Sequence, residues 1–352
     1  MPFREIAGHR RLLALAAGAA MRGTLPPSLM FVGPEGVGKR LAAIALAQVL
    51  NCPSPVPFRP LDQPGAVSDD ESASDETLRD ACGTCPSCLR IARGVHADVL
   101  IIEPGDSGSI KVDQIREAIE RSTFRPFEGR RRVVVVDDAD AMIVEAQNAL
   151  LKTLEEPPPS SVFVLVTTRP ELLLPTVRSR CQRLRFGRLS PSEVAGVLMK
   201  AHGYETAEAH AAASAADGSV GVALEGASEE FAQARDAAVG LLKDLSKGGD
   251  PRRRLEGART LTGSGRVGLD RDELARRLRA LASMLRDMAA LHARIDEREL
   301  ANADFAPVLQ GLLRAFDGGR TVRAFAAVDE ALAALDRNAS PKIVADWVAF
   351  QV

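Results

Sequence analysis

A glycine-rich segment near the start of the sequence has the residues needed to hold a phosphate group. Gly33, Gly36 and Gly38 precede Lys39. In a loop of this kind the backbone N–H groups surround the phosphates, the Lys reaches them, and a following Ser or Thr holds Mg²⁺. Here the following residue is Arg40, a permanent cation that has no lone pair for a metal. The sequence predicts a loop that could hold ATP or ADP without hydrolysing it, and Arg40 could contact phosphate in place of Mg²⁺.

A second element of a phosphate site follows a run of four valines at residues 133–136. Four β-branched residues in a row favour a central parallel strand that is buried on both faces. Asp137 comes next, where a carboxylate usually completes the Mg²⁺ shell, and Asp138 stands where a Glu usually polarises the attacking water. Because Asp is one methylene shorter than Glu, we expect Asp138 to fall short of that water. The alternative interpretation is a solvated acidic turn.

An Arg in the segment Ser179-Arg180-Cys181 could act on a phosphate bound to another chain. An Arg at the edge of a domain can enter a neighbour's phosphate site, where its planar guanidinium neutralises charge in the transition state. The alternative is an ordinary solvated charge, since several other arginines lie close by in the sequence. They are Arg178, Arg183, Arg185 and Arg188.

Four of the five cysteines have the spacing of a metal site. They are Cys52, Cys82, Cys85 and Cys88, and the last three form two overlapping C-x-x-C steps. In a cytosolic chain this pattern favours metal over disulfides, and four thiolates close the tetrahedral shell of a structural zinc ion. A redox pair or unrelated core cysteines remain alternatives, as does His96 as a substitute ligand. Cys181 lies far along the chain, and we expect it to be a buried thiol.

The segments between these residues predict alternating strands and helices. Short apolar runs predict strands at residues 28–32, 99–102, 133–136, 161–168 and 184–186, and helical patterns occupy residues 40–50, 112–122 and 141–154. This alternation indicates a parallel α/β sheet up to about residue 187. Residues 53–81 differ, because five prolines and a cluster of acidic side chains leave too little apolar surface to order them. We expect a flexible excursion there, between the first cysteine of the metal site and the other three.

Beyond residue 187 the apolar spacing is that of helices. For example, Leu274, Leu278, Leu281 and Leu285 recur at intervals that place them on one helix face. We therefore expect three domains. These are an α/β domain with the metal module (about 52–88) over residues 1–187, a small helical lid over residues 188–227, and an all-helical domain over residues 228–352.

The composition excludes several classes of protein. The chain has 352 residues, a formal net charge of −2, and 46% hydrophobic and 26% charged residues, as expected for a globular protein of two or three domains. This charge balance excludes a polybasic nucleic-acid binder, and one Trp and one Tyr leave too few aromatics for a single-strand stacking surface. No run approaches the roughly 20 apolar residues of a membrane span. Arg10-Arg11 with residues 12–21 resembles a secretory signal, but cleavage there would remove the first helix. We expect a cytoplasmic protein.

Four motifs together resemble the AAA+ clamp-loader family. They are the loop at residues 33–39, the C-x-x-C-x-x-C cluster, the block Asn148-Ala149-Leu150-Leu151-Lys152-Thr153-Leu154-Glu155-Glu156-Pro157-Pro158, and Ser179-Arg180-Cys181. The resemblance covers residues 3–225, and the helical remainder fits a collar domain by position and length only. It implies an AAA+ α/β nucleotide-binding fold in which Thr167 or Thr168 senses the γ-phosphate, with Thr168 our choice. In this family the lid usually carries a sensing Arg after a Gly-Ser pair. Here Gly218-Ser219-Val220 is followed by Gly221, so the resemblance implies that the sensing Arg is absent.

Three parts of the hydrolytic machinery are therefore altered together, at Arg40, Asp138 and Gly221, whereas the outward-facing Arg180 is retained. Through the resemblance, this combination predicts a clamp-loader subunit that does not hydrolyse ATP but supplies Arg180 to a neighbouring ATPase subunit. The implied partners are the gamma/tau and delta subunits in a hetero-pentamer, and the sliding clamp and primed DNA through that complex. Two alternatives remain open, an active ATPase subunit of the gamma/tau kind and a zinc-dependent nucleic-acid adaptor outside any ring.

Overall fold

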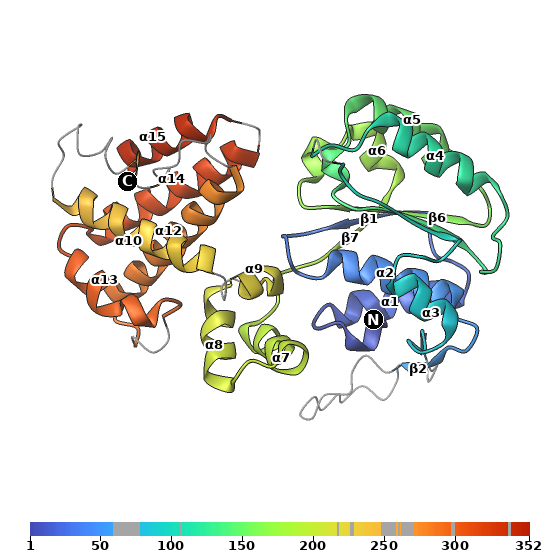
Figure 1. Ribbon diagram of the computed structural model, residues 1–352, viewed down its shortest axis with the longest axis horizontal. Helices are drawn as coiled ribbons and strands as arrows, with labels where there is room; N and C mark the ends of the chain where they lie inside the picture. Colours follow the sequence, from blue (N-terminus) through green and yellow to red (C-terminus); the bar gives the residue numbers. More distant parts are fainter. Residues whose placement is uncertain are drawn as a thin grey trace. The chain divides into compact units, whose positions relative to one another are not determined.

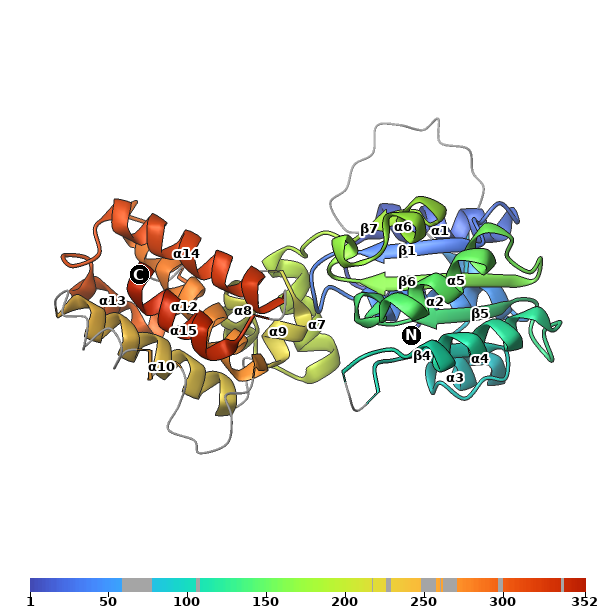
Figure 2. The ribbon, with the colours of Figure 1, turned by 90° about the horizontal axis from the view of Figure 1, so that it is seen from above.

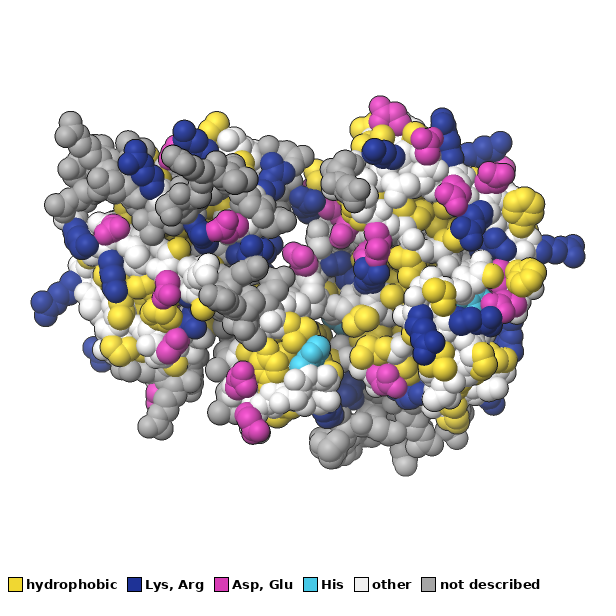
Figure 3. All heavy atoms as spheres, viewed as in Figure 1, with side chains coloured by type: hydrophobic (Ala, Val, Ile, Leu, Met, Phe, Trp, Pro, Cys, Tyr) yellow, Lys and Arg dark blue, Asp and Glu magenta, His cyan; other side chains and the backbone are white. Residues whose placement is uncertain are grey.

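The computed structural model divides the chain into two compact units, Met1–Glu193 and Val194–Val352. The structure describes residues 1–58, 78–105, 108–216, 218–225, 229–247, 258–259, 261, 271–296, 300–336 and 339–352. Among these residues, no helix is both long and apolar enough to cross a membrane. Basic and acidic side chains are interspersed on the face drawn in Figure 3.

The first unit is built on a five-stranded parallel sheet with the strand order β4-β5-β6-β1-β7 (Figures 1 and 2). The strands are β1 (Ser28–Val32), β4 (Val99–Ile102), β5 (Arg132–Val136), β6 (Ser161–Thr167) and β7 (Gln182–Arg185). Every residue of β5 and β6 is buried, as expected for central strands covered on both faces. The parallel α/β fold predicted from the alternating pattern is confirmed. The last strand begins two residues earlier than predicted.

Helices cover both faces of this sheet. On one face, α1 (Arg10–Met21) and α2 (Lys39–Asn51) share a core with Leu29, Phe31 and the odd-numbered valines of β5. On the other face, α4 (Val112–Thr123), α5 (Val144–Glu155) and α6 (Pro175–Arg180) pack with Met30, Phe163 and the even-numbered valines (Figure 1). The short helices η1 (Phe3–Glu5), η2 (Ala139–Ala141) and η3 (Pro170–Leu172) complete this unit, with α3 (Pro86–Ala92) beside α2. Because the strands are parallel, their carboxyl ends meet at one edge, where α/β proteins bind ligands.

The prediction that residues 53–81 are flexible is wrong at the two ends of this segment. β2 (Val56–Phe58) and β3 (Leu78–Asp80) form a two-stranded antiparallel ribbon, while residues 59–77 lie outside the described residues. Phe58 is buried in the core of the unit, and the buried carboxylate of Asp80 accepts the backbone N–H groups of Phe3 and Arg4. These long-range contacts order a segment whose composition, taken alone, predicts disorder.

In the described part of the second unit, every element is helical. The helices are α7 (Pro191–His202), which begins just before the unit, α8 (Thr206–Ala215), α9 (Val220–Glu225), α10 (Glu229–Ser246), α12 (Arg271–His292), η5 (Ala303–Phe305), α13 (Ala306–Leu312), α14 (Gly318–Asp336) and α15 (Pro341–Gln351). All four leucines predicted to share a helix face are buried on α12, in a core formed with α10, α14 and α15. The helical C-terminal region is therefore confirmed. Its division into a lid and a second domain at residue 227 stays a prediction.

Candidate phosphate and metal sites

The glycine-rich loop joins β1 to α2 at the carboxyl edge of the sheet. Gly36 and Gly38 have φ angles of 69° and 97°, and Gly38 is the N-cap of α2, so glycine is needed for the turn. A Cβ on Gly33 would lie 2.2 Å from the carbonyl oxygen of Phe186. The loop therefore has the backbone that directs N–H groups and the positive end of a helix toward an anion.

Lys39 is folded into the same loop. Its side chain donates hydrogen bonds to the carbonyl oxygens of Gly33 (2.8 Å) and Pro34 (2.6 Å), and only 6% of the residue is exposed. Burial lowers the pKa of Lys39, although Glu35 and nearby aspartates oppose this effect. The predicted cradle of Gly33, Gly36, Gly38 and Lys39 is thus brought together by one turn of chain, and the ammonium group lies inside it.

Arg40 points to the carboxyl ends of β4 and β5. Its Nη1 lies 3.3 Å from Oδ2 of Asp137, and its Nη2 forms an ion pair with Glu103. Desolvation raises the pKa of Asp137, and the Arg40 guanidinium partly opposes that rise. The cation at this edge is therefore a side chain of the protein itself. A guanidinium offers no ligand to Mg²⁺, and it occupies the carboxylate that would otherwise do so. Mg²⁺ coordination does not fit these residues.

Asp138 follows Asp137 at the end of β5 in a left-handed conformation, with φ of 47°. Desolvation raises the pKa of Asp138, and the carboxylates of Asp137 and Asp140 raise it further. These two neighbours make the turn an acidic cluster.

The predicted sensor position contains a network that the sequence analysis missed. Thr167, the last residue of β6, donates a 2.6 Å hydrogen bond to Oδ1 of Asp140, and Nε of Arg169 donates to Oδ2 of the same carboxylate at 2.8 Å. Thr168 lies one residue beyond the strand and is half-buried. Asp140 stands three residues after Asp137, and Arg169 two after Thr167, but this spacing alone does not predict their pairing.

Arg180 is the last residue of α6, and its side chain is 31% exposed. Its Nε donates to Glu155 of α5 at 2.7 Å, Nη2 pairs with the same carboxylate, and Nη1 donates to the carbonyl oxygen of Thr176 at 2.8 Å. The guanidinium therefore lies at the surface of the first unit, held by one partly exposed carboxylate and one turn of its own helix.

The four cysteines predicted as metal ligands lie together. All four sulfur atoms are within 4.8 Å of one another, and those of Cys82 and Cys88 are 4.0 Å apart. Four sulfurs at about 2.3 Å from a zinc ion would be separated by about 3.8 Å, so this donor set fits a tetrahedral zinc site. Cys52 is the C-cap of α2, while Cys85 is the N-cap of α3.

Backbone hydrogen bonds favour the thiolate forms of Cys52, Cys82 and Cys88, whereas burial opposes them. The N–H groups of Cys82, Cys85 and Cys88 point at the sulfur atoms of Cys52, Cys82 and Cys85, at 3.3, 3.3 and 3.4 Å respectively. Desolvation by itself would raise the pKa of Cys82, but hydrogen bonds from Thr84 and Cys85 lower it to about 6. Desolvation raises the pKa values of Cys52 and Cys88, which are fully buried.

His96 is not part of the sulfur cluster. It is 3% exposed, its Nε2 lies 3.1 Å from Oγ of Ser87 and 3.4 Å from Oε1 of Glu128, and its Nδ1 accepts the N–H of Asp98 at 3.1 Å. His96 as a substitute metal ligand is therefore wrong. Cys181 is a buried thiol as predicted, and burial raises its pKa to about 12.

A phosphate loop after the first strand of a parallel sheet, with an acidic residue after β5, which is separated from β1 by β6, is an arrangement typical of P-loop nucleotide-binding proteins. Residues 66–190 match the family described as DNA polymerase III, delta subunit. Over 153 residues the chain is 37% identical to DNA polymerase III subunit delta' of Pseudomonas aeruginosa (43% of this chain, 40% of that protein). It is 31% identical over 190 residues to delta' of Bacillus subtilis (54% and 51%), and 31% identical over 198 residues to subunit gamma/tau of Mycobacterium tuberculosis (56% and 31%).

The chain spans about a third to a half of the length of these relatives. The matches confirm the resemblance to the AAA+ clamp-loader family that the motifs predict.

Proposed function

We propose that this chain is a clamp-loader subunit of DNA polymerase III of the delta' kind, which does not hydrolyse ATP but supplies Arg180 to a neighbouring ATPase subunit. The observation that carries the proposal is the ion pairing of Arg40 with Asp137 and Glu103. A hydrolytic P-loop site needs a hydroxyl and a carboxylate on Mg²⁺ at this point. In this chain the hydroxyl is absent, and the carboxylate is paired with a guanidinium.

The position of Arg180 supports its role as a finger. Its planar fork suits phosphate oxygens, which carry more charge than the single carboxylate it contacts here. Because Glu155 and Arg180 are both partly exposed, breaking their pair costs about 0–1 kcal/mol. A phosphate presented by another subunit could therefore draw Arg180 away from Glu155 at little cost.

The relatives are named as DNA polymerase III subunits, and this supports the proposed partners. These are gamma/tau and delta subunits in a hetero-pentamer, with the sliding clamp and primed DNA bound through the complex.

We assign residues 188–227 to a lid and residues 228–352 to a collar domain. The four cysteines hold a structural zinc ion, since their sulfur geometry leaves no open position for catalysis.

The test is the ATPase rate of the reconstituted complex containing Arg180→Ala. The site that faces this subunit should lose about 10³-fold in rate, because an arginine finger contributes at least that much. Arg180→Lys keeps the charge without the fork and should restore only part of the rate.

Arg183→Ala is the matched control, because Arg183 is an exposed Arg on the adjacent strand β7. It should leave both the rate and assembly unchanged. If the Arg180→Ala complex assembles, as judged by gel filtration, and hydrolyses ATP at the wild-type rate, the finger assignment is wrong.

A further inference from the structure

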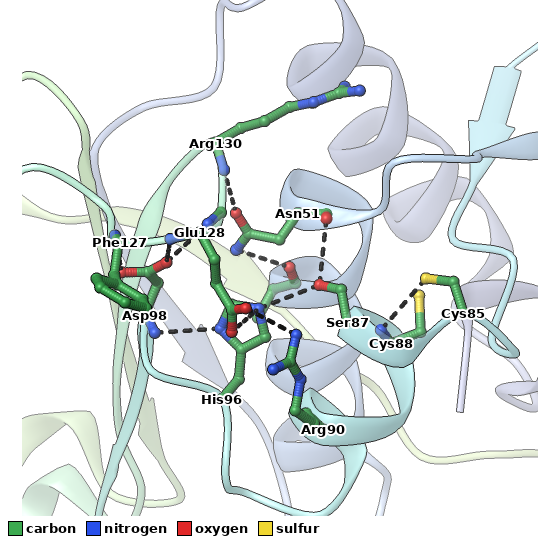
Figure 4. Close-up of polar contacts among 12 residues, drawn as sticks. Asn51, Cys85, Ser87, Cys88, Arg90, His96, Asp98, Phe127, Glu128 and Arg130 are labelled. Atoms are coloured by element: carbon green, nitrogen blue, oxygen red, sulfur yellow. Dashed lines mark hydrogen bonds and ion pairs between the residues drawn. The ribbon is translucent and has the colours of Figure 1, made fainter.

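A partly buried polar cluster joins the four-cysteine site to the loop between α4 and β5, residues 124–131 (Figure 4). This loop displays Phe127, which is 84% exposed, and Phe124, which is 61% exposed. Its backbone is held by two separate acceptors, Asp98 and Asn51, which are both buried. The two acceptors differ in how they are connected to the cysteines.

The first anchor does not involve the cysteines. Asp98 is fully buried directly before β4, and its carboxylate accepts the N–H groups of Phe127 (2.7 Å), Glu128 (2.9 Å) and Gly129 (2.7 Å). Nη2 of Arg132 donates to the same carboxylate at 2.9 Å. Asp98 and Arg132 both lie at the sheet, so this half of the loop is held by the central fold.

The second anchor is adjacent to a metal ligand. Asn51 is the last residue of α2 and directly precedes Cys52. Its Oδ1 accepts the N–H groups of Arg130 at 2.8 Å and Arg131 at 2.9 Å. A Cβ on Gly129 would lie 2.5 Å from that oxygen, so only glycine permits this approach.

Helix α3, which carries Cys88, makes the remaining connections (Figure 4). Oγ of Ser87 donates to the carbonyl oxygen of Asn51 at 3.3 Å and lies 3.1 Å from Nε2 of His96. Nη2 of Arg90 donates to Oε2 of Glu128 at 2.8 Å, and Nε2 of His96 lies 3.4 Å from the other oxygen of that carboxylate. Asn51 and Glu128 are thus both fixed by a helix of seven residues.

Little apolar packing holds that helix in place without a metal. The buried hydrophobic cluster at the cysteines consists of Cys52, Ala81 and Cys88 alone among the described residues. Ile91 of α3 reaches the main core, but most other side chains of this helix are exposed. A structural metal in such a small module contributes directly to its folding free energy.

We propose that the metal at the four cysteines positions the 124–131 loop through Asn51, so that the surface displaying Phe124 and Phe127 is set by metal occupancy. Asn51 is a positioning residue, since it contacts the loop and not the ion. The two anchors give the inference an internal control. Metal removal should release the amides bound to Asn51 more than those bound to Asp98.

The experiment is amide hydrogen exchange on the full chain, first loaded with zinc and then stripped by a chelator. Exchange at Arg130 and Arg131 should become faster by about tenfold or more, as for a locally opened segment. Exchange at Phe127, Glu128 and Gly129 should change less, and that of β5 and β6 should not change. Equal acceleration throughout the first unit, or none at Arg130 and Arg131, would overturn the proposal.

Variants separate the positioning role from metal binding itself. Asn51→Ala retains all four cysteines, so it should bind one zinc per chain and still show the fast exchange at Arg130 and Arg131. Asn51→Asp keeps an acceptor oxygen and should restore protection. Asn302→Ala removes an equally buried amide in the second unit and should leave the loop unchanged. Slow exchange in zinc-loaded Asn51→Ala would also overturn the proposal.

Discussion

The two ends of helix α2 carry two different kinds of site. At its N-terminus, Gly38 and Lys39 belong to a phosphate loop with the backbone of a nucleotide site, but the next side chain is Arg40. At its C-terminus, Asn51 leads into Cys52, and all four sulfurs needed for a closed zinc shell are present. One helix therefore carries an incomplete site at one end and a complete one at the other.

The difference shows which functions depend on the backbone and which depend on side chains. Anion binding at a helix N-terminus uses N–H groups and glycine conformations, which do not depend on the residue at position 40. Metal binding and hydrolysis depend on the identity of single side chains, so one change from a hydroxyl to a guanidinium removes them. We infer that the N-terminal end has kept the capacity to hold an anion, whereas the C-terminal end has a structural role.

The largest effect should follow from removing zinc from the four-cysteine site at the C-terminal end of α2. Apparent zinc-binding free energies of structural sites are on the order of 10 kcal/mol or more, and a module with so little apolar core depends on them. The wild-type chain should contain one zinc by elemental analysis, and Cys88→Ser should contain none and unfold at a lower temperature.

Cys181→Ser is the matched control, because Cys181 is also buried but lies outside the cluster. It should retain full zinc content. A wild-type chain purified without zinc, or a Cys88→Ser chain with one equivalent, would contradict a structural zinc site.

A smaller effect is expected at Asp98, which holds the 124–131 loop from the sheet. Hydrogen bonds from Glu128, Phe127 and Gly129, together with Arg132, outweigh desolvation and lower the pKa of Asp98. Asp98→Asn removes the charge that pairs with Arg132 and replaces one acceptor oxygen by an NH2 group that faces buried N–H donors, so it should cost about 3–5 kcal/mol of unfolding free energy at pH 7.

This cost should depend on pH in one direction. An ionised Asp98 stabilises the fold at every pH above its unfolded pKa of about 3.9, and the contribution is lost as the pH falls through the lower folded value. Denaturant unfolding of metal-stripped protein should therefore show a constant difference at neutral pH that shrinks below about pH 4. The exposed Asp113→Asn should change stability by less than about 0.5 kcal/mol. A difference that stays constant as the pH falls below about 4 would rule out the charge as its source.

Sequence reasoning located the sites at both ends of α2 because each site depends on residues that are close together in the chain. The glycines and Lys39 form a single loop, and three of the four cysteines lie within seven residues. The valines of β5 were found as an unbroken β-branched run and the leucines of α12 by their helical spacing, and both patterns indicate burial.

The polar contacts that connect these elements could not be predicted in the same way. Asn51 and Arg130 are 79 positions apart, and Arg4 and Asp80 are 76 apart. Such pairs form only after the sheet brings distant turns together, and no local pattern marks an Asn or Asp that will accept backbone N–H groups. The ion pair of Arg40 with Asp137 is of the same kind, since the sequence left open a contact with phosphate.

The smallest effect should appear at the N-terminal end of α2. With Mg·ATP, the purified chain and Lys39→Ala should release phosphate at the same background rate, because Arg40 and Asp137 leave no ligands arranged for Mg²⁺. Arg40→Thr restores the hydroxyl, but Asp138 still stands where a Glu is usual, so its rate should rise by less than about tenfold. Steady hydrolysis by the wild type that disappears in Lys39→Ala would show that the incomplete end is catalytic after all. In that case an active subunit of the gamma/tau kind would be the better assignment, and the chain that carries Arg180 would also hydrolyse ATP at its own site.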